Sequence, residues 1–318
     1  MRRPPPEIAV VIPTFRHPER LPRLVGALER QSIPPDRFEV VVVDDGSGDD
    51  TPEVLAKLAD ATPLRLRPVV LERNAGPAAA RNAGWVSTSA PVVAFTDDDC
   101  VPDPEWLRFG LGALMRGSSI GIVQGATLKP QGPQTWGRWT VFREIVGPTP
   151  WFEGCNLFLR REALEQTGGF DEEIRMVAED TWLGWAVLAA GWERGFDELA
   201  TVRHDLSERG LRWHVRMGWR ERNALRVARE FPDLQREGFW RPWALRPLNA
   251  AFAAGAIGTV VAVRRPVALL AWLPWWWMRR PPFGFHPYFR YLGEKWLVDA
   301  AVFAGMKVGA VRYRRFAV

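Results

Sequence analysis

The chain has 318 residues, enough for one large domain or two fused ones, and its 47% hydrophobic and 25% charged residues are ordinary for a globular protein. Its two cysteines, Cys100 and Cys155, lie far apart without metal-ligand spacing, which argues against a zinc cluster or a disulfide framework and fits a reducing compartment. The formal net charge of +5 is distributed unevenly, because residues 241–318 hold 12 Lys/Arg against 2 Asp/Glu, a net of +10.

The first hundred residues alternate short apolar runs with helix patterns. The apolar runs lie at residues 8–12, 38–43, 66–71 and 91–96. Helix patterns follow the first three runs, at residues 19–30, 52–59 and 77–87. Apolar strands that alternate with helices predict a parallel sheet covered on both faces, whose ligands bind beyond the carboxyl ends of the strands.

Acidic residues stand at two of these strand ends. Asp44 and Asp45 follow the second run, and Asp97, Asp98 and Asp99 follow the fourth. Clustered carboxylates repel one another and are costly to bury unpaired, so such ends indicate a bound cation or hydrogen-bond donors. Residues i and i+2 of an extended segment point the same way, so we expect Asp97 and Asp99 to face a ligand together, with Asp98 pointing elsewhere or contacting a ribose.

The sequence contains neither of the common glycine-rich phosphate cradles. No GxGxxG follows the first strand, where residues 13–16 stand instead, and no GxxxxGK[ST] occurs. A sheet that binds a nucleotide diphosphate without these cradles needs another way to neutralise the ligand's charge. A carboxylate-held Mg²⁺ or Mn²⁺ provides it, because such an ion bridges protein carboxylates and phosphates.

The second part of the chain is less regular. We expect a helix over residues 105–115, a strand over residues 120–127, and an apolar helix that begins at Glu179 and Asp180. A Gly/Pro/Trp-rich loop follows the strand. An arginine-rich amphipathic helix is expected over residues 211–230.

Six motifs in chain order resemble the family 2 glycosyltransferases with the GT-A fold, over residues 7–230. The motifs lie at residues 11–14, 43–47, 74–84, 97–99, 168–171 and 179–180. Their shared order and spacing are typical of that family. The resemblance implies a metal-dependent, inverting enzyme that moves a sugar from a nucleoside-diphosphate donor to an acceptor hydroxyl.

The resemblance also assigns residues to the nucleotide. It implies that Asp45 accepts a hydrogen bond from the base, with Pro13 and Thr14 beside the base or its ribose. A uracil N3–H is a donor that suits a carboxylate, so UDP is favoured, with dTDP or GDP as alternatives. The other interpretation of Asp44 and Asp45 is a simple turn, since Asp, Gly and Ser are turn residues.

The acidic triplet resembles the DxD motif of the family. By that likeness Asp99 ligates the metal, Asp97 holds the ribose or shares the metal, and Asp98 contacts the nucleotide. Asp180 is the candidate general base, although an acid at this position also stabilises the start of a helix. Arg81 borders the donor site in the family, so we expect it either to contact the nucleotide or to lie on the surface.

Other polar residues carry weaker functional hypotheses. Some GT-A enzymes place an additional metal-ligating histidine near the position of His204, but for a lone histidine we favour a structural role. Arg216, Arg220 and Arg222 are expected on a solvated basic helix face, with contact to a diphosphate or an anionic acceptor as the alternative. Cys155 is expected to pack near the acceptor site.

The basic tail contains two apolar runs. Residues 250–263 carry no charge, Arg264 and Arg265 follow, and residues 267–278 include three consecutive tryptophans. Each run is shorter than the roughly 20 residues that span a bilayer as one helix. Apolar runs beside basic residues and tryptophan suit an anionic membrane surface better than nucleic acid. We expect a helical pair at the membrane interface, and the alternative is a buried pair packed on the catalytic domain.

The predicted fold is α/β: a GT-A-type nucleotide-binding sheet flanked by helices over residues 1–235, then a basic, Trp-rich helical extension over residues 236–318. Residues 1–103 form the donor half and residues 104–235 the acceptor half. The expected acceptor is a lipid-linked or cell-surface glycan precursor, with no nucleic-acid partner. We expect no secretory signal, and a cytoplasmic protein that is peripheral on the inner face of the membrane. The alternatives are a sugar-nucleotide nucleotidyltransferase and an inactive scaffold that binds a nucleotide sugar.

Overall fold

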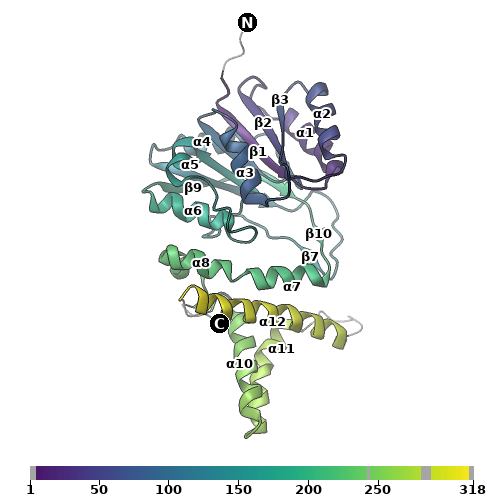
Figure 1. Ribbon diagram of the computed structural model, residues 1–318, viewed down its shortest axis with the longest axis vertical. Coiled ribbons are helices and arrows are strands. Elements are labelled where there is room, and N and C mark those ends of the chain that lie inside the picture. Colours follow the sequence, from purple (N-terminus) through teal and green to yellow (C-terminus); the bar gives the residue numbers. More distant parts are fainter. Residues whose placement is uncertain (1–4, 242–243, 281–287, 315–318) are drawn as a thin grey trace. The chain divides into compact units, whose positions relative to one another are not determined.

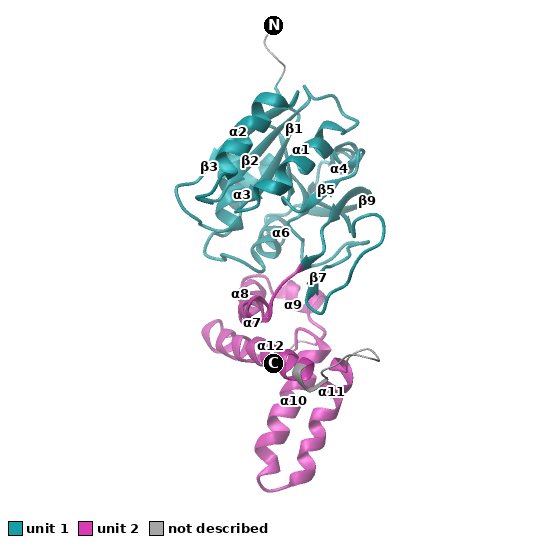
Figure 2. Ribbon diagram, turned by 90° about the vertical axis from the view of Figure 1, so that its right-hand side faces the viewer, with its two compact units in different colours: residues 1–207 teal, residues 208–318 magenta. Residues whose placement is uncertain are grey.

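The computed structural model describes residues 5–241, 244–280 and 288–314, and the chain forms two compact units (Figures 1 and 2). Unit 1 spans Met1–Ser207 and unit 2 spans Glu208–Val318. From the sequence we placed the division after residue 235. The structure places it between residues 207 and 208, so the helices within residues 208–235 belong to the C-terminal unit.

Unit 1 is built on a mixed sheet of eight strands in the order β3-β2-β1-β4-β8-β6-β9-β5. Its strands are β1 (Ile8–Thr14), β2 (Phe38–Asp44), β3 (Arg65–Val70), β4 (Val92–Thr96), β5 (Cys100–Pro102), β6 (Ile120–Leu128), β8 (Asn156–Arg160) and β9 (Glu193–His204). The first four strands are parallel, as the sequence predicted. In the second half β8 runs antiparallel to β4 and β6, and β5 runs antiparallel to β9. A separate sheet pairs β7 (Thr140–Val141) with β10 (Ser207–Glu208).

Helices cover both faces of the large sheet (Figure 1). They are η1 (Pro18–Arg20), α1 (Leu21–Glu29), α2 (Thr51–Ala61), α3 (Pro77–Val86), α4 (Trp106–Leu114), α5 (Arg161–Thr167) and α6 (Glu179–Ala189). On one face α3 approaches β1 at Gly84, where a Cβ atom would lie 2.3 Å from Val11 Cγ1. On the other face Ile8, Val10 and Ile12 join a buried cluster with residues of α1, α2 and α4. This alternation follows from the two-residue period of a strand.

Unit 2 is helical. Its elements are α7 (Leu211–Arg220), α8 (Asn223–Glu230), α9 (Pro232–Gly238), α10 (Pro247–Ala262), η2 (Pro266–Trp272), α11 (Leu273–Arg279) and α12 (Tyr288–Arg312). The single helix expected over residues 211–230 is interrupted at residues 221–222, where Glu221 pairs with Arg246 at 3.2 Å. Among the described residues, none of the helices combines the length and apolarity needed to cross a bilayer.

Small residues explain why α7 belongs to unit 2. A Cβ atom at Gly305 of α12 would lie 2.6 Å from the carbonyl oxygen of Trp219, and one at Gly218 of α7 would lie 2.9 Å from Val302 Cγ2. Such close approach lets the two helix backbones pack tightly. The boundary of unit 2 therefore depends on which helices pack together. The change in amino-acid composition near residue 236 does not indicate this packing.

Candidate functional site

Three parallel strands of unit 1 end at the same edge of the sheet. The register places Thr14 of β1 opposite Asp44 of β2, and β4 lies on the other side of β1. Thr14 Oγ1 donates a hydrogen bond of 2.7 Å to Asp98 Oδ2. The acids that follow β2 and β4 therefore lie at one edge, as the sequence predicted.

The acidic triplet does not continue as an extended strand. The chain turns at residues 97–100, where the Cys100 N–H donates to the Asp97 carbonyl at 3.1 Å, so the expected i, i+2 alternation does not apply. Asp98 is the most buried of the three, at 7% exposure. Its Oδ1 accepts a bond of 2.9 Å from Arg20, which also approaches Asp99 at 3.5 Å. Arg20 is a site residue that the sequence reasoning missed.

Burial is the main influence on Asp98. It raises the pKa of this carboxyl above its ordinary value, and the hydrogen bond from Thr14 and the charge of Arg20 oppose that rise. Both oxygens of Asp98 already accept a bond from the protein. Asp98 thus braces the turn that presents Asp97 and Asp99, and its contact with a nucleotide stays a prediction.

Asp45 holds the loop that precedes α3. Its carboxylate accepts hydrogen bonds from the backbone N–H groups of Ala75 at 2.7 Å and Gly76 at 2.9 Å, and from the Asn74 side chain at 3.0 Å. Burial raises the pKa of Asp45, and the two backbone bonds oppose the rise. Oδ1 accepts only the Ala75 bond among those described, so it keeps acceptor capacity toward a ligand.

Asp44 forms the turn that the sequence offered as an alternative. It is fully buried and accepts hydrogen bonds from the backbone and hydroxyl of Ser47. Gly46 adopts φ +65°, and a Cβ atom there would lie 2.5 Å from the backbone of Arg73. The two neighbouring acids therefore differ: Asp44 shapes the turn, and Asp45 points to the loop at residues 74–76.

His204 lies beside the last acid of the triplet. Strands β5 and β9 pair Cys100 with His204, which brings His204 Nε2 to 3.4 Å from Asp99 Oδ1. His204 Nδ1 lies 2.7 Å from the Asp205 carbonyl, so Nδ1 carries the proton in that hydrogen bond and Nε2 faces Asp99. Potential ligand atoms of Asp99, Cys100 and His204 lie within 4.8 Å of one another.

The chemistry of these groups favours two of them as metal ligands. Burial raises the pKa of the Cys100 thiol well above its usual value, which disfavours the thiolate that a metal would need. Burial also raises the pKa of Asp99, and the nearby His204 opposes this. A bound cation would relieve the cost of ionising Asp99, so Asp99 and His204 fit a divalent ion. We had favoured a structural role for His204, and the geometry gives it a second interpretation.

Arg81 connects the acidic triplet to the start of α6. The side chain is 4% exposed, and its two terminal nitrogens reach Asp97 at 2.8 Å and Glu179 at 3.2 Å. Its guanidinium also lies 5.4 Å from the centre of the Phe170 ring. Burial would lower the pKa of Arg81, but the charges of Asp97, Glu179 and Asp180 outweigh it and raise the pKa. The surface interpretation of Arg81 is therefore wrong.

Asp180 lies in the first turn of α6. Its oxygens accept hydrogen bonds from the Gly154 N–H at 2.8 Å and the Thr181 N–H at 2.7 Å. Burial, followed by the charge of Glu179, raises the pKa of Asp180 to about 8, while Arg81 acts in the opposite direction. The two residues before the helix, Val177 and Ala178, have φ of +66° and +76°. Two successive non-glycine residues in this region indicate stored strain at the site.

Glu153 is a further acid that the sequence reasoning missed. It accepts a hydrogen bond from Thr149 Oγ1 at 2.7 Å and pairs with Arg143 at 3.1 Å. Its charge adds to the rise in the pKa of Asp180. Because Glu153 lies in a loop rather than after an apolar run, no local pattern indicated it.

The family of the chain follows from comparison with known proteins. Residues 9–171, half of the chain, match the model of Glycosyl transferase family 2. The protein belongs to this family. The match favours a glycosyltransferase over the alternative of a sugar-nucleotide nucleotidyltransferase.

Two curated relatives and one solved structure illustrate the relationship. Glycosyltransferase AglE of Haloferax volcanii is 28% identical over 184 residues, which cover 56% of this chain and 60% of the relative. Validoxylamine A glucosyltransferase of Streptomyces hygroscopicus subsp. limoneus is 34% identical over 224 residues, 58% of this chain and 49% of the relative. The chain thus spans 49% to 60% of the length of these relatives.

The solved structure is the mannosyltransferase PcManGT from Pyrobaculum calidifontis in complex with GDP-Man and Mn²⁺. It superimposes with a TM-score of 0.64 at 23% identity, over 94% of this chain and 87% of that chain. This likeness confirms the GT-A fold, a mixed α/β sheet flanked by helices.

Proposed function

We propose that the protein is an inverting glycosyltransferase that moves a sugar from a nucleoside-diphosphate donor to an acceptor hydroxyl. The observation that supports this most is the position of Arg81, which joins Asp97 on the donor side to Glu179, the neighbour of Asp180. Arg81 thus brings Asp97, a residue expected to bind the donor, close to the expected base, whose pKa the charge of Arg81 lowers. Such proximity is what a direct displacement requires.

Asp180 is the proposed general base. Its carboxylate takes the proton of the acceptor hydroxyl as that oxygen forms a bond to the anomeric carbon. The bond from this carbon to the diphosphate breaks on the opposite face, and its electron pair leaves with the nucleoside diphosphate. A pKa of about 8 keeps the base near the operating pH, where proton transfer is efficient. The bonds from Gly154 and Thr181 fix its orientation.

Asp99 and His204 would hold a divalent metal ion, Mg²⁺ or Mn²⁺, with Asp97 as a further ligand or a ribose contact. When bound, the ion offsets the charge of the departing diphosphate. The Mn²⁺ in the PcManGT complex supports a divalent ion as the cofactor. Arg20 pairs with Asp98 and Arg81 pairs with Asp97, so the two arginines offset part of the negative charge of the triplet.

UDP is the proposed nucleotide of the donor. Asp45 would accept the N3–H of the base, and Pro13 and Thr14 would border the base or its ribose. Two observations support this role of Asp45: its Oδ1 can accept a further hydrogen bond, and its carboxylate is fixed by hydrogen bonds from the loop at residues 74–76. GDP is the second choice, because PcManGT binds GDP-Man.

The proposed acceptor is a lipid-linked or cell-surface glycan precursor. The basic, Trp-rich helices of unit 2 support this, since contact with the inner face of the membrane would bring the active site to a lipid-borne acceptor. The protein would then be cytoplasmic and peripheral.

Donor hydrolysis without an acceptor tests the function. The purified chain would be incubated with UDP-, GDP- and dTDP-sugars, with and without Mn²⁺. We expect slow, metal-dependent release of nucleoside diphosphate from one donor class. Asp99→Asn should abolish it, whereas Asp60→Asn, an exposed carboxylate on α2, should not. A chain that binds a donor but never hydrolyses it would be a scaffold, contrary to the proposal.

A further inference from the structure

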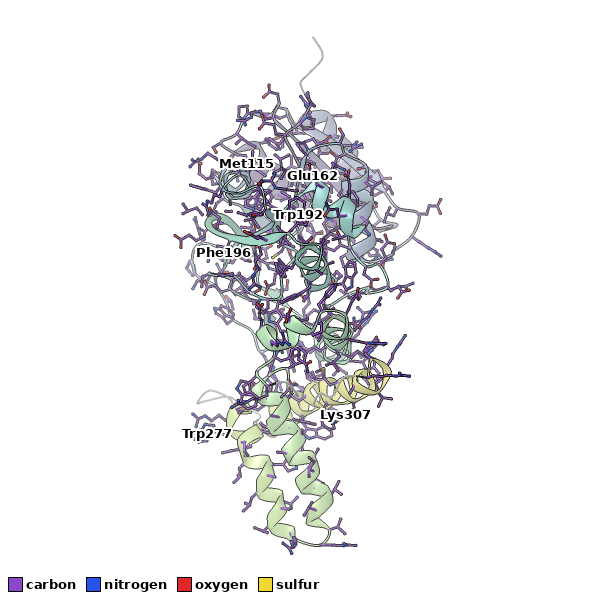
Figure 3. All side chains as sticks on the ribbon, turned by 90° about the vertical axis from the view of Figure 1, so that its left-hand side faces the viewer. Met115, Glu162, Trp192, Phe196, Trp277 and Lys307 are labelled. Atoms are coloured by element: carbon purple, nitrogen blue, oxygen red, sulfur yellow. The ribbon has the colours of Figure 1, made fainter. Side chains whose placement is uncertain are left out.

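Unit 2 contains a helical hairpin (Figure 2). Many of its apolar side chains are exposed. We call residues 247–279, which comprise α10, η2, α11 and the turn between the first two, the apolar hairpin. Eleven of its large apolar side chains are exposed: Ile257, Val260, Val261, Val263, Val267, Leu269, Leu270, Leu273, Trp276, Trp277 and Met278. Val260 is 74% exposed and Val263 is 88% exposed. Trp277 projects away from the ribbon in Figure 3. Ile257, Val260 and Val261 follow the i, i+3, i+4 spacing of one helix face, and an exposed apolar face of this kind normally marks an interaction site.

The hairpin is internally well packed, so its exposed face does not result from loose structure. Phe252 of α10 contacts Trp272 and Phe303, with ring centres 5.2 and 5.7 Å away. Gly255 and Gly258 let the two arms approach, because Cβ atoms there would lie 2.3 Å from the Trp272 ring and 2.4 Å from the carbonyl oxygen of Ala268. Phe252, Gly255 and Gly258 thus lie on the packed face of α10.

A buried carboxylate fixes the base of the hairpin to α12. Asp299 is 4% exposed and accepts hydrogen bonds of 2.8 Å from the Trp275 indole and from Arg279 Nε. This turns Trp275 inward and leaves the next two residues, Trp276 and Trp277, on the outside. Asp299 thus holds two residues of α11, Trp275 and Arg279, through one carboxylate, and this clamp keeps the apolar face in one orientation.

The charge around the apolar face has one sign. The sequence contains no Asp or Glu between Glu237 and Glu294. Exposed Arg264 and Arg265 stand at the turn of the hairpin, and Arg280 at its other end stacks over the Trp277 ring at 3.6 Å. Arginine and tryptophan at the ends of an apolar segment are typical of helices that lie in a membrane interface.

The length of the hairpin limits how it meets a bilayer. α10 has 16 residues, and at 1.5 Å per residue it is shorter than the roughly 30 Å hydrocarbon core. Basic residues at both ends of the arms would also be costly at the bilayer centre. Both facts favour a hairpin lying along the surface over one that inserts across it.

We propose that the apolar hairpin docks on an anionic lipid bilayer, lying in the interface with its exposed apolar side chains among the acyl chains and Arg264, Arg265 and Arg280 at the anionic headgroups. This docking proposal rests on the proposed function. It adds the chemistry of the lipid and the face of the protein that binds it. A second copy of the chain could also cover an apolar face, but the uniformly positive rim would repel its own copy and attract anionic lipid.

Vesicle flotation with the purified full-length chain tests the docking. We expect the chain to float with vesicles of phosphatidylcholine and phosphatidylglycerol, and to bind pure phosphatidylcholine vesicles at least about tenfold more weakly. Val260→Asp should lower binding to the anionic vesicles by at least about tenfold, because it places a charge on the inserted face. Val86→Asp is the matched control, since Val86 is 65% exposed on α3 and should change nothing. Arg264→Gln with Arg265→Gln should remove the anionic preference.

Donor hydrolysis measured on the same samples separates the two proposals. Loss of flotation in Val260→Asp with hydrolysis retained supports the docking. A wild-type chain that hydrolyses a donor but does not float overturns the docking and leaves the enzyme proposal intact. A chain that floats but hydrolyses no donor would support the docking proposal and contradict the proposed enzymatic function. Concentration-dependent dimers of the wild type, abolished by Val260→Asp without any vesicle binding, would assign the face to a second copy and also overturn the docking.

Discussion

Arg81 is the residue on which the electrostatics of the site depend. It is buried between Asp97 and Glu179 and close enough to Asp180 to stabilise that carboxylate. Removing a partner from a buried ion pair leaves an uncompensated charge and is costly, so the acids and the arginine stabilise one another. The charge of Arg81 therefore links the acid that follows β4 to the proposed base on α6.

Two substitutions should shift the pH dependence of turnover in opposite directions. The proposed base must be ionised, so activity should rise with pH through a value near 8, the pKa of Asp180. Arg81→Gln removes a charge that lowers this pKa, so the rising limb should move to higher pH by roughly one unit. Glu179→Gln removes a charge that raises it, so the limb should move to lower pH.

The measurement is kcat/KM against pH for the wild type and both variants. Opposite shifts in the two variants distinguish an electrostatic effect from a folding defect. A misfolded variant would lose activity at every pH, and its pH profile would not shift. Shifts in the same direction, or none, would contradict the assigned electrostatic role.

His204 supplies a test of the metal site. Because His204 Nε2 faces Asp99 and its Nδ1–H is held by the Asp205 carbonyl, His204→Ala should weaken Mn²⁺ binding by at least about tenfold. Isothermal titration with Mn²⁺ and the nucleotide measures this directly. His214→Ala, on α7, is the control and should leave the affinity unchanged. Equal affinities in both variants would return His204 to a structural role.

At the scale of elements, local patterns explain the first half of unit 1 well. Apolar runs ended by acids predicted β2 and β4 and the edge where Asp45 and Asp97 lie, because local alternation determines both. The proximity of Asp99 and His204 depends on pairing between β5 and β9, strands about a hundred residues apart with no local signal. The turn at residues 97–100 likewise depends on Thr14 and Arg20 from other elements.

Helix α4 offers a matched pair of glycines for a stability test. A Cβ atom at Gly110 would lie 2.1 Å from the Phe158 ring, whereas one at Gly112 meets nothing within 4 Å. Gly110→Ala should lower the free energy of unfolding by about 1–3 kcal/mol through overpacking. Gly112→Ala should raise it by roughly 0.5–1 kcal/mol, because alanine favours a helix. Urea unfolding of both variants measures the difference, and equal stabilities would contradict the packing of α4 on β8.

At the scale of the whole molecule, the chain separates a unit with the GT-A fold from a basic helical unit. Composition alone located the basic region, since the charge changes sign along the sequence. It did not locate the boundary, because glycines of α12 and α7 decide which helices pack together. It also did not show which face of the apolar runs is buried, since Asp299 and the aromatic cluster around Phe252 determine that.

In the proposed mechanism one carboxylate, Asp180, removes the acceptor proton, while other residues bind the donor. The most direct measurement is the turnover of Asp180→Asn at saturating donor, with donor affinity determined on the same protein. We predict that kcat falls by at least about 100-fold while the donor dissociation constant changes by less than about twofold. Turnover close to that of the wild type, with the donor still bound, would contradict the account.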